Sequence, residues 1–135
     1  MADVLLDTSA IFALLNPDDD HHAGAVAIND RLIRQKATLI LPNFLLAECH
    51  AILNKRLGPR AARGFLNAAL QDFQIERISV EDEWTAHAML QNVSRQRDLS
   101  YFDAVAVALA QRLQISDVFS FDRHFAIMGL KLLSA

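Results

Sequence analysis

The sequence is poor in the residues that mark several common protein classes: its 135 residues include one cysteine, four glycines, three prolines, one tryptophan and one tyrosine. A single cysteine, Cys49, excludes an internal disulfide framework and a cysteine-rich zinc site, and it suits a reducing compartment. Few glycines and prolines, no repeat and 53% hydrophobic residues exclude disordered and fibrous chains. We therefore expect a single globular domain over residues 1–135, located in the cytoplasm.

Long apolar runs are also missing. No uninterrupted stretch reaches the roughly 18 residues of a membrane span. The apolar N-terminal segment lacks a basic start and contains Asp7, which a signal peptide would exclude. A glycine-rich phosphate loop and a Gly-x-Ser-x-Gly elbow are absent as well. These absences favour a protein that is not exported and whose chemistry depends on neither motif.

The net charge of −3, from 13 basic and 16 acidic residues, argues weakly against a nucleic-acid ligand. If four acids form a metal site, however, 12 acids remain against 13 basic residues, and bound cations reverse the local sign. Nine basic residues are candidates for phosphate contacts, and the sequence singles out none of them: Arg31, Arg34, Lys36, Lys55, Arg56, Arg60, Arg63, Arg95 and Arg97.

Short apolar segments alternate with helical segments along the chain. We expect strands at residues 4–6, 38–41, 73–78, 118–119 and 130–133. Helices are expected at 11–15, 21–36, 43–57 with Asn43 as its N-cap, 60–71, 81 to about 93, and from 100 onward. This alternation predicts an α/β fold, a three-layer α/β/α sandwich with a central, mainly parallel sheet of about five strands.

Two acidic residues lie on helices that are otherwise almost free of charge. The residues three and four positions from Asp103 or from Glu48 include no basic side chain, so neither acid can form an ion pair within its own helix. Asp103 could instead belong to a capping box with Ser100, and Glu48 could simply face solvent. Both acids remain candidates for a site built with partners from elsewhere in the chain.

Two further acids follow expected strands. Asp7 comes directly after residues 4–6, and Asp122 comes shortly after residues 118–119. Ligands in parallel sheets bind at the carboxyl ends of the strands, so these acids are placed for function. The alternatives are an N-cap role for Asp7 and a turn paired with Arg123 for Asp122.

Four carboxylates that converge in one pocket cannot all stay ionised unaided, because like charges raise one another's pKa. A hard divalent cation resolves this repulsion, and Mg²⁺ and Mn²⁺ prefer oxygen ligands and recruit substrate phosphates. The chemistry that follows is metal-assisted hydrolysis of a phosphodiester. The tract Asp18-Asp19-Asp20-His21-His22 also looks like a metal tract, but its position predicts a turn that opens a helix.

The sequence resembles the PIN-domain family, particularly its VapC-type toxins, over nearly the whole chain. The segments that carry the resemblance, in order, are Leu5-Leu6-Asp7-Thr8-Ser9, the helix with Glu48, Leu99-Ser100-Tyr101-Phe102-Asp103-Ala104, and Ser120-Phe121-Asp122-Arg123-His124-Phe125. Ser120 stands where the family often has threonine, which keeps the hydroxyl group. The fold that this resemblance implies agrees with the one expected from periodicity.

The resemblance implies an Mg²⁺- or Mn²⁺-dependent endoribonuclease. Asp7, Glu48, Asp103 and Asp122 would be both the catalytic residues and the metal ligands, with Ser9 and Ser120 as supporting polar groups. It further implies an RNA substrate, a small antitoxin protein as partner, and a homodimer.

Two other functions are compatible with the same pattern. A PIN-like module could bind RNA or protein without cleaving it, because intact ligands do not prove turnover. A receiver-like signalling domain also alternates strands and helices, but it needs a phospho-acceptor aspartate after its third strand, where Glu81 and Asp82 here look like a helix start. Aspartyl-phosphate phosphatases are disfavoured, because their Asp-x-Asp pattern has Ser9 in place of its second aspartate.

Overall fold

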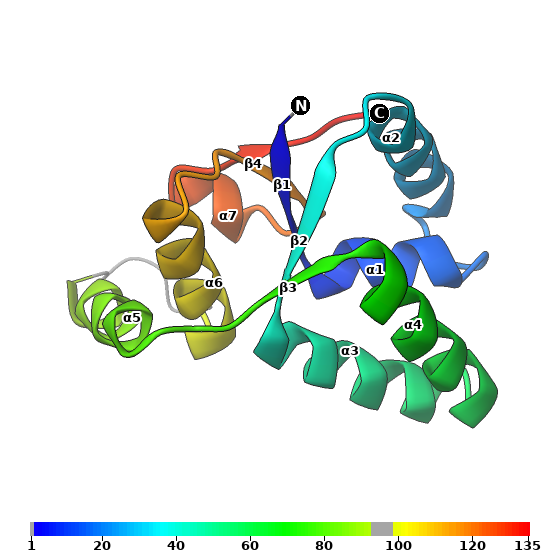
Figure 1. The fold of residues 1–135 in the computed structure, drawn as a ribbon, viewed down its shortest axis with the longest axis horizontal. Coiled ribbons are helices and arrows are strands. Elements are labelled where there is room, and N and C mark those ends of the chain that lie inside the picture. The colour runs from blue at the N-terminus through cyan, green and yellow to red at the C-terminus, as the bar shows by residue number, and fades with distance from the viewer. Residues whose placement is uncertain (1, 93–98) are drawn as a thin grey trace.

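The computed structural model describes residues 2–92 and 99–135, which form an alternating α/β fold (Figure 1). The strands are β1 (Asp3–Leu6), β2 (Thr38–Pro42), β3 (Gln74–Glu76), β4 (Asp117–Phe119) and β5 (Lys131–Leu132). The helices are α1 (Thr8–Leu15), α2 (His22–Arg34), α3 (Asn43–Arg56), α4 (Pro59–Asp72), α5 (Val80–Asn92), α6 (Tyr101–Arg112) and α7 (His124–Ile127). The end of the expected helix at residue 93 lies outside the described residues.

The five strands form one sheet in the order β3-β2-β1-β4-β5, and every neighbouring pair is parallel. Strand β1 is central, and its residue Leu6 pairs with Phe119 of β4. The carboxyl ends of β1 and β4 therefore lie side by side. This order differs from the 2-1-3-4-5 order of receiver-type domains, so the topology argues against the receiver alternative.

Helices cover both faces of the sheet, with α5 and α6 on one side and α1, α2 and α4 on the other (Figure 1). The expected three-layer sandwich with a parallel five-stranded sheet is confirmed. None of the described helices is long and apolar enough to cross a membrane.

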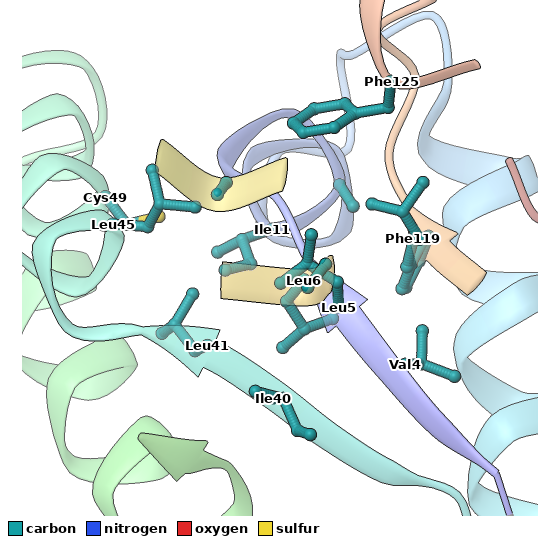
Figure 2. Close-up of a cluster of buried hydrophobic side chains, with 14 of the residues drawn as sticks. Val4, Leu5, Leu6, Ile11, Ile40, Leu41, Leu45, Cys49, Phe119 and Phe125 are labelled. Atoms are coloured by element: carbon teal, nitrogen blue, oxygen red, sulfur yellow. The ribbon is translucent and has the colours of Figure 1, made fainter. Parts of the chain in front are cut away.

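The core forms where β1 meets its neighbours, because a central strand covered on both faces must be apolar throughout. Val4, Leu5 and Leu6 of β1 are each at most 1% exposed. Figure 2 shows these side chains between the apolar residues of β2 and Phe119 of β4, with Cys49 entering from α3. Cys49 is a free, buried thiol, as expected. Because β1 is packed in this core, the position of its last residue, Leu6, is fixed, and Asp7 is the next residue in the chain.

The N-terminal caps of helices α1, α6 and α3 can be compared with the sequence predictions. Asp7 is the N-cap of α1 and accepts a hydrogen bond from Ser9 N at 3.3 Å. Ser100 caps α6 and accepts from Asp103 N at 3.1 Å. The N-cap prediction for Asn43 is wrong: Pro42 occupies that position, and the Asn43 side chain instead accepts a hydrogen bond from Ile78 N at 3.1 Å. That long-range contact competes with local capping, and sequence spacing does not reveal it.

A buried ion pair joins α5 to α6. Asp82, 2% exposed, accepts two hydrogen bonds of 2.9 Å from Arg112, one from Nε and one from Nη2. Ser79 and Asp82 also form a reciprocal capping box at the start of α5. Burial raises the pKa of Asp82, but the hydrogen bonds from Arg112 and Ser79 outweigh it and hold that pKa below its ordinary value. Asp82 is therefore a structural acid rather than a phospho-acceptor.

Asp82→Ala is expected to lower the free energy of unfolding by about 2 kcal/mol, measured by urea denaturation, because it leaves Arg112 unpaired and removes the cap. The cost is limited because Arg112 is one third exposed. The lowered pKa of Asp82 means that its contribution is present above about pH 4 and is lost as the pH falls further. Glu83→Ala, an exposed neighbour, serves as the control; an equal loss in both variants would contradict the assignment.

Candidate active site

A cleft of about 360 Å³ opens at the carboxyl ends of β1 and β4, where parallel sheets bind ligands. All four acids singled out in the sequence line it: Asp7, Glu48, Asp103 and Asp122. They come from four different segments, namely the β1–α1 junction, helix α3, the first turn of α6 and the β4–α7 loop. The fold thus brings together side chains up to 115 positions apart in sequence.

Asp7 is held by two serines. It is 7% exposed, and its Oδ2 accepts hydrogen bonds of 2.8 Å from both Ser9 Oγ and Ser120 Oγ. A buried polar group is costly unless it is hydrogen-bonded, and the two hydroxyl groups meet this need. Asp7 does cap helix α1, but capping is not its whole role. The two serine hydroxyl groups also orient its carboxylate at the cleft.

The same serines tie the loop after β4 to the site. Ser9 Oγ accepts a hydrogen bond from Phe121 N at 3.0 Å, and Ser120 Oγ accepts one from Asp122 N at 3.0 Å. The two hydroxyl oxygens lie 3.2 Å apart. Asp7 and the segment that carries Asp122 are thus positioned by one hydrogen-bond network that includes Ser9 and Ser120.

Glu48 is oriented from α1 rather than exposed to solvent on all sides. Thr8 Oγ1 donates a 2.6 Å hydrogen bond to Glu48 Oε1, and the Cys49 thiol donates to Thr8 Oγ1 at 3.4 Å. Burial is the main cause that raises the pKa of Cys49 to about 12, so the thiol stays protonated and is no nucleophile at neutral pH. Thr8 is a site residue that sequence reasoning did not single out.

Asp103 and Asp122 lie close to each other in the cleft. With His124 they offer three ligand atoms that all lie within 4.8 Å of one another. His124 Nδ1 is 2.7 Å from Asp122 Oδ1, so the side chain that contacts Asp122 is His124 and not Arg123, the partner in the turn alternative. Burial first, and then the charges of Asp122 and Asp7, raise the pKa of Asp103 to about 6.

This donor set fits a divalent cation. Carboxylate oxygens suit Mg²⁺ and Mn²⁺, and imidazole is a common ligand of transition metals. After burial, the causes that raise the pKa of Asp103 are the neighbouring negative charges of Asp122 and Asp7, which a cation would offset. His124 was missed in the sequence because a histidine two positions after an acid is common in turns; its place in the short, unexpected helix α7 brings it into the group.

The lining of the cleft also includes residues other than the four predicted acids. The tract around residues 18–22 precedes α2, as expected of a turn, and Asp19 Oδ1 accepts a hydrogen bond from His21 N at 2.8 Å. Asp19 and His21 nevertheless reach the cleft, together with Phe12, Arg56 and Phe121. Sequence spacing could not identify these residues, because four separate segments contribute them: helix α1, the loop before α2, helix α3 and the loop after β4.

The geometry can be compared with known proteins. The family model described as PIN domain matches residues 4–130. The chain belongs to the PIN-domain family. This match covers the four acids and both serines.

Two comparisons relate this PIN domain to particular proteins. It is 29% identical over 128 residues, 93% of this chain and 94% of the relative, to the 23S rRNA-specific endonuclease VapC20 of Mycobacterium tuberculosis. The crystal structure of that VapC20, described as a sarcin-ricin loop cleaving toxin, superposes with a TM-score of 0.83 at 27% identity, covering 98% of this chain and 99% of the other.

A more distant structural relative shows how widely the fold extends. VapBC2 from Rickettsia felis, bound to a DNA fragment from its promoter, matches with a TM-score of 0.73 at 14% identity, covering 97% of both chains. At this identity the likeness concerns the fold. The predicted PIN-like architecture is thereby confirmed from sequence and from structure.

Proposed function

We propose that this PIN domain is a divalent-metal-dependent endoribonuclease. The observation that carries the proposal is the meeting of Asp7, Glu48, Asp103 and Asp122 in one cleft, where ligand atoms of Asp103, Asp122 and His124 all lie within 4.8 Å of one another. Such crowding is unfavourable without a cation, which makes it a feature of metal sites rather than of stable cores. Similarity to the endonuclease VapC20 supports cleavage of RNA.

In this proposal Asp7, Glu48, Asp103 and Asp122 hold Mg²⁺ or Mn²⁺, and His124 adds a nitrogen ligand or orients Asp122. When bound, the cation lowers the pKa of a water molecule and stabilises charge on the phosphodiester. Ser9 and Ser120 keep the Asp7 carboxylate in place, and Thr8 does the same for Glu48. Hydrolysis then joins the water oxygen to phosphorus and breaks the bond to the leaving sugar oxygen.

The biological setting forms part of the same proposal. The chain acts as the toxin of a toxin–antitoxin pair, with a small antitoxin as partner, as a homodimer and in the cytoplasm. The likeness to VapC20 and to VapBC supports the toxin–antitoxin part of this proposal, whereas the homodimer and the cytoplasmic location follow from the family resemblance of the sequence. The nuclease domain extends over residues 1–135, of which residues 4–130 match the family.

The decisive experiment incubates the purified chain with a mixed pool of structured RNAs in Mg²⁺, in Mn²⁺ or in EDTA. Cleavage that needs Mg²⁺ or Mn²⁺ and stops in EDTA is the expected result. An inactive Asp103→Asn variant, prepared in parallel, excludes a contaminating nuclease. RNA that binds but stays intact under every metal condition would contradict the proposal and favour the non-catalytic module.

A further inference from the structure

Besides the acids, the lining of the cleft contains aromatic rings and a cation, which a metal site does not need. His21 stacks on Phe121 with ring centroids 4.4 Å apart and an interplanar angle of 7°. The Arg56 guanidinium lies over the Phe12 ring, 5.4 Å from its centroid. All four side chains line the same cleft as the carboxylates. The cleft therefore combines a metal-binding side with a planar, cationic side.

The His21–Phe121 stack is fixed relative to the acids. Phe121 lies between Ser120 and Asp122, and its backbone N donates to Ser9 Oγ. The backbone N of His21 donates to Asp19 Oδ1. His21 is exposed, so the ring face turned away from Phe121 is accessible. A flat ring held beside a phosphodiester-cleaving centre is suited to continue the stack with a nucleobase.

Arg56 supplies the complementary charge. It is exposed at the end of α3, and within residues 2–92 and 99–135 it forms no ion pair with a carboxylate. Its stacking on Phe12 restrains the guanidinium while leaving its N–H donors available. Because Arg56 lines the cleft without a carboxylate partner among the described residues, it is placed to bind a phosphate of the RNA strand once a bound cation offsets the charge of the acids.

We propose that His21 and Arg56 are substrate-positioning residues: a base of the RNA stacks on the outer face of the His21 ring, and Arg56 binds a phosphate of the same strand. This inference rests on the proposed nuclease function and adds to it the residues that align the strand. The alternative is structural, in which His21 only covers Phe121 and Arg56 only covers Phe12.

The test measures binding and catalysis separately. Binding of a short fluorescein-labelled single-stranded RNA is followed by anisotropy in Mn²⁺ in the Asp103→Asn background, where the strand stays intact. His21→Ala should raise Kd about tenfold, whereas His21→Phe should stay near the starting value because the ring is retained. His87→Ala is the matched control, since His87 is also exposed and packs edge-on against Tyr101 outside the cleft.

Arg56→Gln should weaken binding and reduce the slope of log K against log salt by about 0.7, the share of one phosphate contact on a single strand. Lys55→Gln is the control: Lys55 is on the same exposed turn but outside the cleft. This variant removes the same charge and should weaken RNA binding less than Arg56→Gln does. In otherwise wild-type protein, His21→Ala should raise KM and leave kcat within about twofold of wild type, a split that a purely structural role does not produce.

The outcomes separate the two proposals. If His21→Ala binds RNA as well as His87→Ala does, or Arg56→Gln as well as Lys55→Gln does, the positioning role is overturned. If the Asp103→Asn background does not bind RNA at all, it is overturned too. If RNA binds and depends on His21 and Arg56, but the wild type never cleaves it, the positioning role stands and the nuclease function fails.

Discussion

Asp103→Asn is expected to lower metal-dependent RNA cleavage by at least about a thousandfold while the chain remains folded. The carboxylate lies within 4.8 Å of ligand atoms of Asp122 and His124, and an amide binds hard cations far less well. The N-cap bond from Asp103 N to Ser100 Oγ uses the backbone, so the substitution keeps it. Initial cleavage rates in Mn²⁺, together with circular dichroism, measure the two effects.

The same variant should be more stable than the wild type when metal is absent. Asp103 has a pKa of about 6 in the folded protein, above its ordinary value of 3.8. Between pH 3.8 and about 6, Asp103 is therefore protonated in the folded protein but ionised in the unfolded chain. As the pH rises through this range, the free energy of unfolding falls. Asparagine does not ionise, so the variant does not lose this part of the free energy of unfolding. Because the group is partly exposed, the gain at neutral pH should be about 1 kcal/mol.

Thermal denaturation in EDTA checks this effect, with a higher Tm for Asp103→Asn at neutral pH and no difference near pH 4. Asp30→Asn, an exposed acid on α2, is the control for removal of a charge alone. Retained cleavage in a folded Asp103→Asn protein would rule out the metal-ligand role. A large loss of stability would instead favour the capping role considered for this residue.

Ser120→Ala is expected to reduce kcat/KM about 10- to 100-fold, the range for losing a group that orients a metal ligand. Its hydroxyl, 2% exposed, donates to Asp7 Oδ2 and accepts from Asp122 N. Removing it leaves the buried Asp7 with one serine hydroxyl and frees the segment before Asp122. Half-maximal activity should also require more Mn²⁺, which a titration of initial rate against Mn²⁺ measures.

Ser120→Thr is the matched control because it keeps the hydroxyl group. This variant should retain activity within about fivefold, the remaining loss reflecting the extra methyl group in a packed site. If Ser120→Ala cleaves as fast as Ser120→Thr, and needs no more Mn²⁺, then the network around Asp7 does not support catalysis and the proposed role of Ser120 fails.

Most secondary structure could be predicted because apolar periodicity and capping residues act locally. The strand at 4–6, the helix after Ser100 and the break at Gly58-Pro59 all follow from neighbours in sequence, and the structure confirms them. Asn43 was mispredicted because its side chain bonds to Ile78, 35 positions away. The short helix α7 was missed because its four residues are too few for a periodic signal.

The site likewise contains residues that could be proposed from the sequence and others that only the structure revealed. The four acids could be proposed from sequence because each sits where its own segment offers no partner or follows a strand. Their meeting in one cleft, and the contacts that Ser9 and Ser120 make with Asp7, appear only in the fold. Thr8, His124 and the His21–Phe121 stack were unpredictable, because threonine, histidine and phenylalanine are common in helices and turns for reasons unrelated to a site.

The sequence by itself determined the alternation of strands and helices, the apolar central strand and the identity of the acids, since these depend on interactions within a few residues. Only the tertiary structure decided which side chains share the cleft. Parallel pairing of β1 with β4 brings Leu6 beside Phe119 across more than a hundred residues of chain. Burial, and then the charges of Asp122 and Asp7, raise the pKa of Asp103, and the ligand atoms that the fold brings together make this cleft a candidate metal site.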